Sequence, residues 1–460
     1  MANTYLTWTP SATPTGSAKK FTFSAWVKFN SENPGLIMVA GSSSSSYCIF
    51  GAYSGGKITL LTYTGYVINF STSRLFKDLN CWYHVVLACD TTQASATSGV
   101  KLYVNGELQT FNLGSVSGQS GYTQNTSLRY GTNGEVITIG ANSLTSQQYF
   151  NGIMSYVAFV DGQQLTPSTF GETDATTGEW KIKTSITPGG TGWGTNGFFI
   201  LKDGNSVTDQ SGNSNNFTVG GGNLTKTEDS PSNVFCTLNP LIRFSSNPTL
   251  STGNLSIDEN GATWQSSAST LGVSQGKWYY EYKAETAGGS GLLHKLGFMS
   301  EQLISAVGHM ADTTVDGGYG WYTNDNGELR TDSAVISGWS ASDITNITSI
   351  TTGDVLKIAI DMDNKFAYFG VNNVWAKNGD PTSGSSGTGG LDISADYPSG
   401  KILIPAVSVY NGCTGSINFG NGYFGTTAVS SAGTNASGIG IFEYDVPTGY
   451  TALSTKGLNL

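Results

Sequence analysis

The chain is built from short runs in which every second residue is apolar, and this alternation restricts its fold more than any other feature. In residues 21–29, Phe, Phe, Ala, Val and Phe occupy the odd positions, so one face of an extended strand there would be buried. The segments 355–361 and 365–369 are two further strand-like runs around a turn at 362–364. Gly, Asn, Ser and Pro separate such runs along the whole chain. The pattern predicts an all-β protein.

Composition agrees with this fold class. Charged residues make up 12% of the chain and aromatic residues 12%, and there are 61 glycines. Many aromatics with few charges argue against disorder, and the turn-forming residues favour loops between short strands. The length of 460 residues predicts more than one domain. We expect two jelly-roll-like β-sandwiches, at 1–165 and 241–460 with a C-terminal tail, joined by an ordered β-rich connector at 166–240.

Charge and cysteine content exclude several classes of function. The net charge is −10 and the 22 basic residues are scattered, so no basic patch predicts nucleic-acid binding. No apolar run reaches the ~20 residues of a membrane helix, and residues 1–10 lack the pattern of a signal peptide. We therefore expect synthesis in a cytoplasm without secretion or membrane insertion.

The cysteines form no C-x-x-C pair, so we expect buried free thiols and neither zinc nor another cofactor; they are Cys48, Cys81, Cys89, Cys236 and Cys413.

Two parts of the chain resemble known domain families. Residues 82–86, 100–107, 137–140 and 150–159 resemble the laminin G-like, concanavalin A-like jelly rolls. Residues 276–281, 296–298, 319–322, 353–364, 404–407 and 417–420 resemble the SPRY domain, with Asn372-Asn373 where that family usually has Asn-Gly. The second resemblance implies a recognition module without catalytic activity.

The two domains, combined with the connector motifs at 170–174, 194–198, 209–213 and 237–240, resemble virion proteins of marine tailed phages. That resemblance implies a non-enzymatic fibre, spike or capsid-surface decoration located on the virion surface. It implies other virion proteins as partners, a host-surface glycan or protein as a ligand, and a homo-oligomer. Two alternatives remain: a pure assembly protein that binds only other virion proteins, and a glycosidase that trims surface polysaccharide.

Catalytic chemistry finds little support in the sequence. A glycosidase needs two carboxylates at the scissile bond, and the nearest patterns, at 172–174 and 443–445, lack the second Glu of an E-x-D-x-E motif. The three histidines, His84, His294 and His309, have no nucleophile motif beside them. We interpret them as core or surface residues and predict no catalytic residue.

An acidic turn offers one candidate metal site. Asp361, Asp363 and Asn364 carry oxygens that calcium prefers, and Asp90 is a further possible ligand. The helix–loop–helix calcium pattern requires a Gly where Phe366 stands. We interpret 361–364 as a hairpin turn and predict no metal site.

A ligand site is predicted where aromatic residues border loops of the second domain. Aromatic rings beside amides and carboxylates suit sugars and peptides. The predicted contact residues are Tyr322, Asn324, Asp325, Trp339 and Trp375. No basic residue precedes Arg330 in this stretch, which favours a neutral glycan or peptide over an acidic polymer. The alternative is that these rings only seal the sandwich edge and that the first domain binds the ligand.

Overall fold

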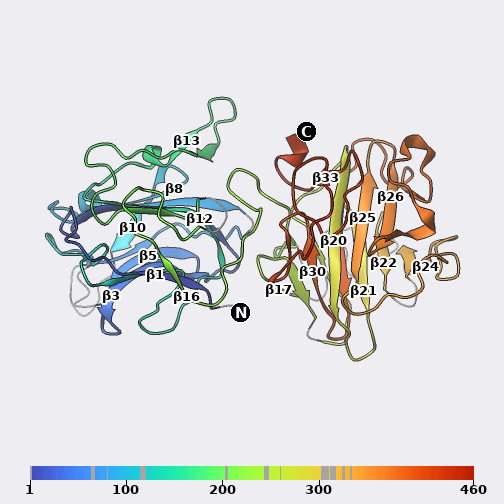
Figure 1. The fold of residues 1–460 in the computed structure, drawn as a ribbon, viewed down its shortest axis with the longest axis horizontal. Coiled ribbons are helices and arrows are strands. Elements are labelled where there is room, and N and C mark those ends of the chain that lie inside the picture. The colour runs from blue at the N-terminus through green and yellow to red at the C-terminus, as the bar shows by residue number, and fades with distance from the viewer. Residues whose placement is uncertain are drawn as a thin grey trace. The chain divides into compact units, whose positions relative to one another are not determined.

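The computed structural model describes residues 3–63, 68–79, 81–113, 121–202, 206–242, 248–259, 261–301, 310, 317–323, 327–331 and 334–459. These residues form two compact units, Met1–Lys226 and Thr227–Leu460, coloured blue to green and green to red in Figure 1. Strands dominate both units and helices are confined to single turns. The predicted all-β class with sandwich-like sheets is confirmed.

The first unit is a sandwich of an eight-stranded and a six-stranded sheet, seen as two layers in Figure 1. In sheet order, the larger sheet contains β10 (Phe111–Leu113), β6 (Asn69–Thr72), β5 (Lys57–Thr62), β4 (Ser46–Ser54), β3 (Gly35–Ser43), β11 (Val136–Ile139), β1 (Tyr5–Trp8) and β16 (Thr218–Gly221). The smaller contains β15 (Phe198–Ile200), β12 (Gly152–Asp161), β2 (Lys20–Phe29), β7 (Trp82–Asp90), β8 (Val100–Val104) and β9 (Glu107–Leu108). A hairpin of β13 (Gly171–Thr173) and β14 (Trp180–Ile182), one short helix α1 (Ala96–Gly99) and the turn η1 (Pro167–Thr169) complete the unit.

The alternation predicted for residues 21–29 places their odd-numbered side chains between the two sheets. Phe21, Phe23 and Val27 are fully buried in the core of the first unit. β7 is apolar on both faces because its outer face is covered as well, where Val86 packs with Phe170 and Phe199.

The segment predicted as a connector does not form a separate part. β15 pairs with β12, and β16 pairs with β1, so both strands extend the sheets of the first unit. The carboxylate of Asp209 accepts hydrogen bonds from the backbone N–H groups of Phe199 (2.8 Å) and Asn215 (2.9 Å), which fixes the polar loop after β15. The boundary between the units falls after Lys226, inside the range 166–240.

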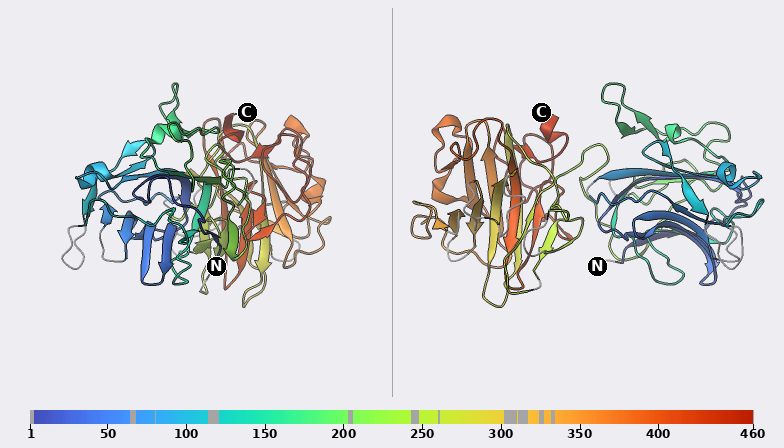
Figure 2. Two further views of the ribbon diagram at one scale, coloured as in Figure 1. Left: turned by 60° about the vertical axis from the view of Figure 1, so that its left-hand side comes forward. Right: turned by 180° about the vertical axis from the view of Figure 1, so that it is seen from behind.

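The second unit is also a two-sheet sandwich, shown from two further sides in Figure 2. Its nine-stranded sheet contains β17 (Thr249–Ser251), β18 (Ser256–Asp258), β30 (Thr414–Asn418), β20 (Lys277–Thr286), β25 (Val355–Asp361), β26 (Phe366–Val371) and β27 (Val374–Trp375), with β28 (Leu391–Asp392) on β26 and β33 (Thr451–Ala452) on β20. Its six-stranded sheet contains β19 (Gln265–Ala268), β29 (Leu403–Val409), β21 (His294–Ser300), β22 (Tyr319–Tyr322), β23 (Glu328–Thr331) and β24 (Ala334–Val335). Outside them lie a hairpin of β31 (Tyr423–Phe424) and β32 (Thr427–Ala428), and the turns η3 (Ala376–Asn378), η4 (Gly384–Ser386) and η5 (Gly457–Asn459).

The acidic turn between β25 and β26 is a hydrogen-bonded hairpin. The buried carboxylate of Asp361 accepts from the backbone N–H groups of Asp363 (3.1 Å) and Asn364 (2.9 Å) and from the Asn364 side-chain amide (2.8 Å). The Lys277 ammonium lies 2.8 Å from the same carboxylate. Its oxygens are thus directed at protein donors, as the hairpin interpretation requires. Asp90 is likewise paired with Lys20, at 2.9 Å.

The five cysteines are free thiols, as predicted, and all except Cys81 are buried. Burial raises the pKa of the half-buried Cys81 thiol to about 11, so it is protonated at neutral pH. A helix long and apolar enough to cross a membrane is not found within the described ranges.

Candidate functional site

One end of the six-stranded sheet of the second unit gathers aromatic and cationic side chains. Lys295 of β21 pairs across the sheet with Tyr322 of β22, and Tyr322 pairs with Glu328 of β23. Trp264 immediately precedes β19 and Tyr410 immediately follows β29, and the adjacent positions 265 and 409 are paired. We call the side chains that meet here the Tyr322 cluster: Trp264, Lys295, Tyr322, Arg330 and Tyr410.

The Tyr322 cluster is held together by ring contacts and cation–π contacts. The Lys295 ammonium lies 4.3 Å from the centre of the Trp264 ring and 5.8 Å from that of Tyr322. The Arg330 guanidinium lies 5.0 Å from the centre of the Tyr322 ring. Trp264 contacts Tyr322 at 5.7 Å and Tyr410 at 5.3 Å between ring centres. Trp264, Arg330 and Tyr410 are half-exposed, whereas Tyr322 and Lys295 are buried beneath them.

Charge at the cluster is partly compensated. The Nε of Arg330 donates to the Glu328 carboxylate at 2.6 Å, while the Nη1 of Arg330 meets no hydrogen-bond partner among the residues described. Half-exposed rings combined with a guanidinium can stack against a sugar or peptide plane and donate hydrogen bonds to its oxygens.

The structure separates the predicted contact residues. Tyr322 belongs to the cluster, while Asn324 and Asp325 lie outside the described residues. Trp339 is only 4% exposed, packed between the sheets against Trp321 and Phe369 at 6.2 and 5.8 Å. The expectation that Trp339 is an exposed contact residue is therefore wrong.

Trp375 lies neither in the Tyr322 cluster nor in the core between the sheets. It is half-buried on the outer face of the nine-stranded sheet, with its ring centre 4.4 Å from the Lys357 ammonium. A single contact face containing Tyr322, Trp339 and Trp375 is thus not formed. The argument from missing basic residues also needs correction, because strand pairing brings Lys295 to the Tyr322 ring.

The sequence prediction missed four members of the cluster: Trp264, Lys295, Arg330 and Tyr410. Each stands at or next to a strand end, but the strands that carry them are distant in the chain and meet only through sheet pairing. A local signal existed for Trp264 and Tyr410, since both are aromatic residues at the border between a strand and a polar loop.

The histidines are placed as structural residues. In the first unit, the Trp180 indole donates to Nδ1 of His84 at 2.9 Å, and Nε2 of His84 lies 2.8 Å from the Ser24 hydroxyl. Nδ1 is therefore an acceptor, and the ring proton is on Nε2, facing Ser24. A general base for a serine nucleophile needs the opposite arrangement. Burial lowers the pKa of His84 to about 3, so the ring is neutral.

His294 in the second unit is similarly occupied. Its Nδ1 is 2.7 Å from the Tyr282 hydroxyl and its Nε2 is 3.1 Å from the Thr286 carbonyl oxygen. Because a carbonyl only accepts, Nε2 carries the proton. Burial lowers the pKa of His294 to about 4. The third histidine, His309, lies outside the described residues.

The acidic patterns at 172–174 and 443–445 have their aspartates held by local hydrogen bonds, Asp174 directly after β13 and Asp445 in a loop. Backbone hydrogen bonds from Thr177 and Thr176, with the Lys181 ammonium, lower the pKa of Asp174 to about 2. The backbone N–H and the hydroxyl of Thr434 lower the pKa of Asp445. A glycosidase acid needs a raised pKa instead. Within the described part of the chain, three or more His, Cys, Asp or Glu side chains nowhere come together as a metal-binding group.

Comparison with known proteins assigns the fold of the first unit. Residues 1–169 match the family model described as the concanavalin A-like lectin/glucanases superfamily. No curated protein sequence matches the chain. The first unit thus contains a laminin G-like, concanavalin A-like lectin domain, and such a domain suggests carbohydrate or protein binding.

Solved structures provide further similarities. The SPRY domain of human HERC1 is 15% identical, with a TM-score of 0.29 over 39% of this chain and 96% of that one. The TRIM65 PSpry domain is 12% identical, with a TM-score of 0.28 over 40% and 91%. The heptameric SAP-like pentraxin from Limulus polyphemus is 16% identical, with a TM-score of 0.27 over 36% and 72%.

Proposed function

We propose that this chain, with its concanavalin A-like lectin domain at residues 1–169, is a non-enzymatic recognition protein of a virion surface. In this proposal the second unit contacts a host-surface glycan or protein through the Tyr322 cluster. The observation that carries the proposal is the convergence of three aromatic rings and two cations at one end of a sheet. Such groups combine apolar contact with directed hydrogen bonds.

Arg330 gives the cluster its specificity. Its guanidinium lies over Tyr322 and is oriented by Glu328, so little side-chain freedom is lost when a ligand binds. Trp264 and Tyr410 beside it are half-exposed. The surface therefore offers a fixed donor next to two ring faces, which suits an oxygen acceptor attached to a flat or ring-shaped ligand.

Two observations support recognition without catalysis. The buried ring of His84 presents a proton to Ser24 and cannot remove one. Asp174 is held ionised by its hydrogen bonds, which is unsuited to proton donation at a glycosidic oxygen. Release of reducing sugar from host polysaccharide would contradict this part of the proposal.

The virion assignment is supported by the order of the laminin G-like and SPRY-like motifs along the chain. In this proposal the protein belongs to a fibre, spike or capsid-surface decoration and binds other virion proteins and further copies of itself. A homo-oligomer would present several Tyr322 clusters at once and so raise avidity. Immunogold labelling of intact particles tests the location, and light scattering of the purified chain tests the oligomeric state.

The recognition surface is tested by Arg330→Gln with Arg74→Gln as its matched control. Arg74 also lies over an aromatic ring, Phe76 at 5.4 Å, and beside an acid, Glu107 at 3.7 Å, but it belongs to the first unit. Attachment to host cells and retention on glycan arrays should fall for Arg330→Gln and persist for Arg74→Gln. Equal attachment of the two variants would refute the assignment. Loss of binding to other virion proteins alone would indicate an assembly role.

A further inference from the structure

The outer face of the nine-stranded sheet holds a buried lysine whose ammonium meets no hydrogen-bond acceptor among the described residues. Lys357 of β25 is 3% exposed. Its ammonium lies 4.4 Å from the centre of the Trp375 ring and 5.4 Å from that of Tyr444. In the described part of the chain no hydrogen bond and no carboxylate within 4.0 Å reaches it. Cation–π contacts offset part of the cost of burial, but no protein acceptor in the described ranges pairs with the N–H donors.

The backbone makes room for this arrangement. A Cβ atom on Gly370 of β26 would lie 2.9 Å from Cε of Lys357, 3.1 Å from the Trp375 ring and 2.6 Å from the carbonyl oxygen of Val374. Only glycine at this position lets the lysine chain and the indole pack side by side. We call the space around the Lys357 ammonium, beside Gly370, Trp375 and Tyr444, the slot. The contact between the lysine and the indole is built into the sheet, and Tyr444 reaches it from a loop.

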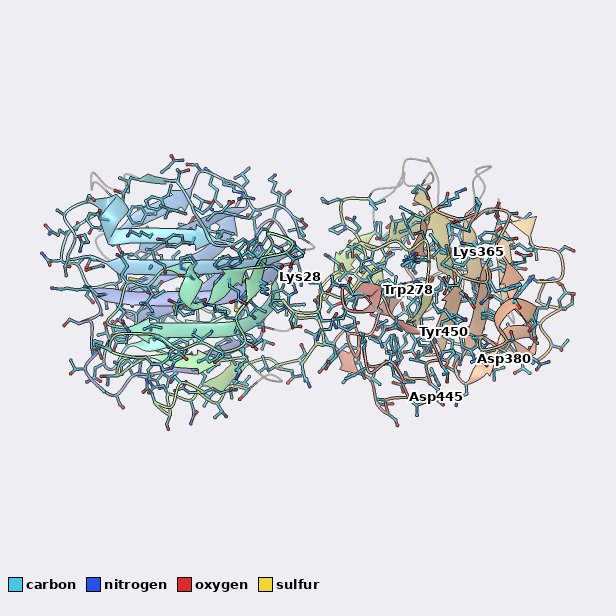
Figure 3. The ribbon with its side chains drawn as sticks, turned by 90° about the horizontal axis from the view of Figure 1, so that it is seen from above. Lys28, Trp278, Lys365, Asp380, Asp445 and Tyr450 are labelled. Atoms are coloured by element: carbon cyan, nitrogen blue, oxygen red, sulfur yellow. The ribbon has the colours of Figure 1, made fainter. Side chains whose placement is uncertain are left out.

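Two further polar groups at this slot have open hydrogen-bonding capacity. The Trp375 indole N–H, on a half-exposed ring, has no acceptor among the described side chains and backbone. Asp445 is exposed, and only its Oδ1 is used, accepting from the backbone N–H (2.6 Å) and hydroxyl (2.8 Å) of Thr434. Asp445 directly follows Tyr444, whose ring lies 5.4 Å from the Lys357 ammonium, and the Lys357 charge contributes to the lowered pKa of Asp445. Figure 3 shows Asp445 at the margin of the second unit.

The charges below the slot are costly to maintain. Glu281 of β20 is fully buried and accepts from the backbone N–H groups of Glu443 and Tyr444, both at 2.8 Å, and from the Tyr279 hydroxyl at 2.8 Å. Burial raises the pKa of Glu281 to about 7 and lowers that of Lys357 to about 8. Buried charges held away from water weaken the fold at neutral pH, and groups with such perturbed pKa values cluster at functional sites.

From this geometry we propose that Lys357, Trp375 and Asp445 form a second ligand site, for a neutral hydroxyl-rich ligand such as a sugar. The ammonium and the indole N–H donate to hydroxyl oxygens, the free oxygen of Asp445 accepts from a hydroxyl, and the half-exposed indole offers apolar contact. Glu281, the cross-strand partner of Lys357, and Asp445, next to Tyr444, place negative charge near the lysine, which disfavours an anionic ligand. The site is independent of the Tyr322 cluster.

The test uses the full chain with D-glucose, D-galactose and D-mannose as neutral probes and D-glucuronate as the charged counterpart. Binding is followed by saturation-transfer NMR on the sugars and by the indole N–H signal of Trp375, assigned with Trp375→Phe. Lys357→Met keeps the bulk and removes the donors, and Lys456→Met is an exposed control. We expect at least one hexose to bind the parent protein and Lys456→Met, and to bind Lys357→Met about tenfold or more weakly.

Asp445→Asn is a second test variant that should fold normally, because Asp445 is exposed and its substitution leaves the buried core intact. This variant should also bind the hexose more weakly than the parent protein does, and it decides the test if Lys357→Met does not fold. Arg330→Gln should leave this binding unchanged, which separates the site from the Tyr322 cluster. The proposal is overturned if no hexose binds, if Lys357→Met and Asp445→Asn bind like the parent, or if glucuronate binds more tightly than glucose.

Discussion

Replacing Lys357 by Met should remove a distinctive pH dependence of stability. The unfolded chain holds the lysine proton up to its ordinary pKa of 10.5, whereas burial lowers the folded-state pKa to about 8. Between these values the folded state binds fewer protons than the unfolded state, so raising the pH favours folding. Below pH 8 the charged lysine costs the folded state the full difference, which is regained as the pH rises from 8 towards 10.5.

The magnitude follows from the two pKa values. The difference between a pKa of 10.5 and one of about 8 corresponds to about 3 kcal/mol, of which roughly 2 kcal/mol falls between pH 8 and pH 10. Glu281 acts in the lower range with the opposite slope. Its raised pKa of about 7 gives stability that is full below about pH 4.5 and lost as the pH rises through 7. Removing the lysine raises the Glu281 pKa further, which only widens the difference at alkaline pH.

Urea denaturation of the parent chain and Lys357→Met at pH 8, 9 and 10, followed by tryptophan fluorescence, measures the effect. The chain has two units, and each can give its own unfolding transition. Lys357 and Trp339 both lie in the second unit, so its transition is identified as the one that Trp339→Ala shifts. The free energy of unfolding of the parent minus that of the variant should increase by at least about 2 kcal/mol over this range. Tyrosine ionisation affects both proteins and cancels in the difference. A difference that stays flat or decreases would show that the ammonium is not held in a desolvated state.

Three further outcomes test the packing and the metal independence of the fold. Trp339→Ala should cost about 3–5 kcal/mol in urea unfolding, because the ring is buried against Trp321 and Phe369; a loss below 1 kcal/mol would contradict its place in the core. Gly370→Ala should lower the free energy of unfolding by about 1–3 kcal/mol through overpacking. An unchanged free energy of unfolding would show that the side chains around Gly370 can move to make room for a methyl group. EDTA should leave the melting temperature unchanged, because protein donors occupy the oxygens of Asp361, and a large drop would place a metal in the fold.

The sequence was a good guide to strands whose burial pattern is local. The alternation at 21–29 correctly predicts which side chains of β2 enter the core. The turn at 361–364 is explained by a carboxylate that accepts from its own following backbone, as expected of Asp at a turn. The edge strands β15 and β16 are only three and four residues long, so their sheet membership depends on distant pairing that no local pattern specifies.

The site was harder to predict for a physical reason. Aromatic residues next to loops occur both at ligand surfaces and at the ends of a core, and only packing distinguishes them. Trp339 fills the core, while Trp264 remains half-exposed beside Tyr322. The contacts of Lys295 with Trp264 and Tyr322 arise from pairing between strands far apart in the chain, and the unpaired ammonium of Lys357 becomes evident only once its surroundings are known.

The most direct test of the recognition role is attachment of the full chain to host cells, comparing Trp264→Ala with Trp180→Ala. Both rings are half-buried, but Trp180 stacks on His84 in the first unit and is not a member of the Tyr322 cluster. With folding verified by circular dichroism, the account predicts that Trp264→Ala loses most of its attachment while Trp180→Ala attaches like the parent chain. Normal attachment of Trp264→Ala, or an equal loss in Trp180→Ala, would contradict recognition through the Tyr322 cluster.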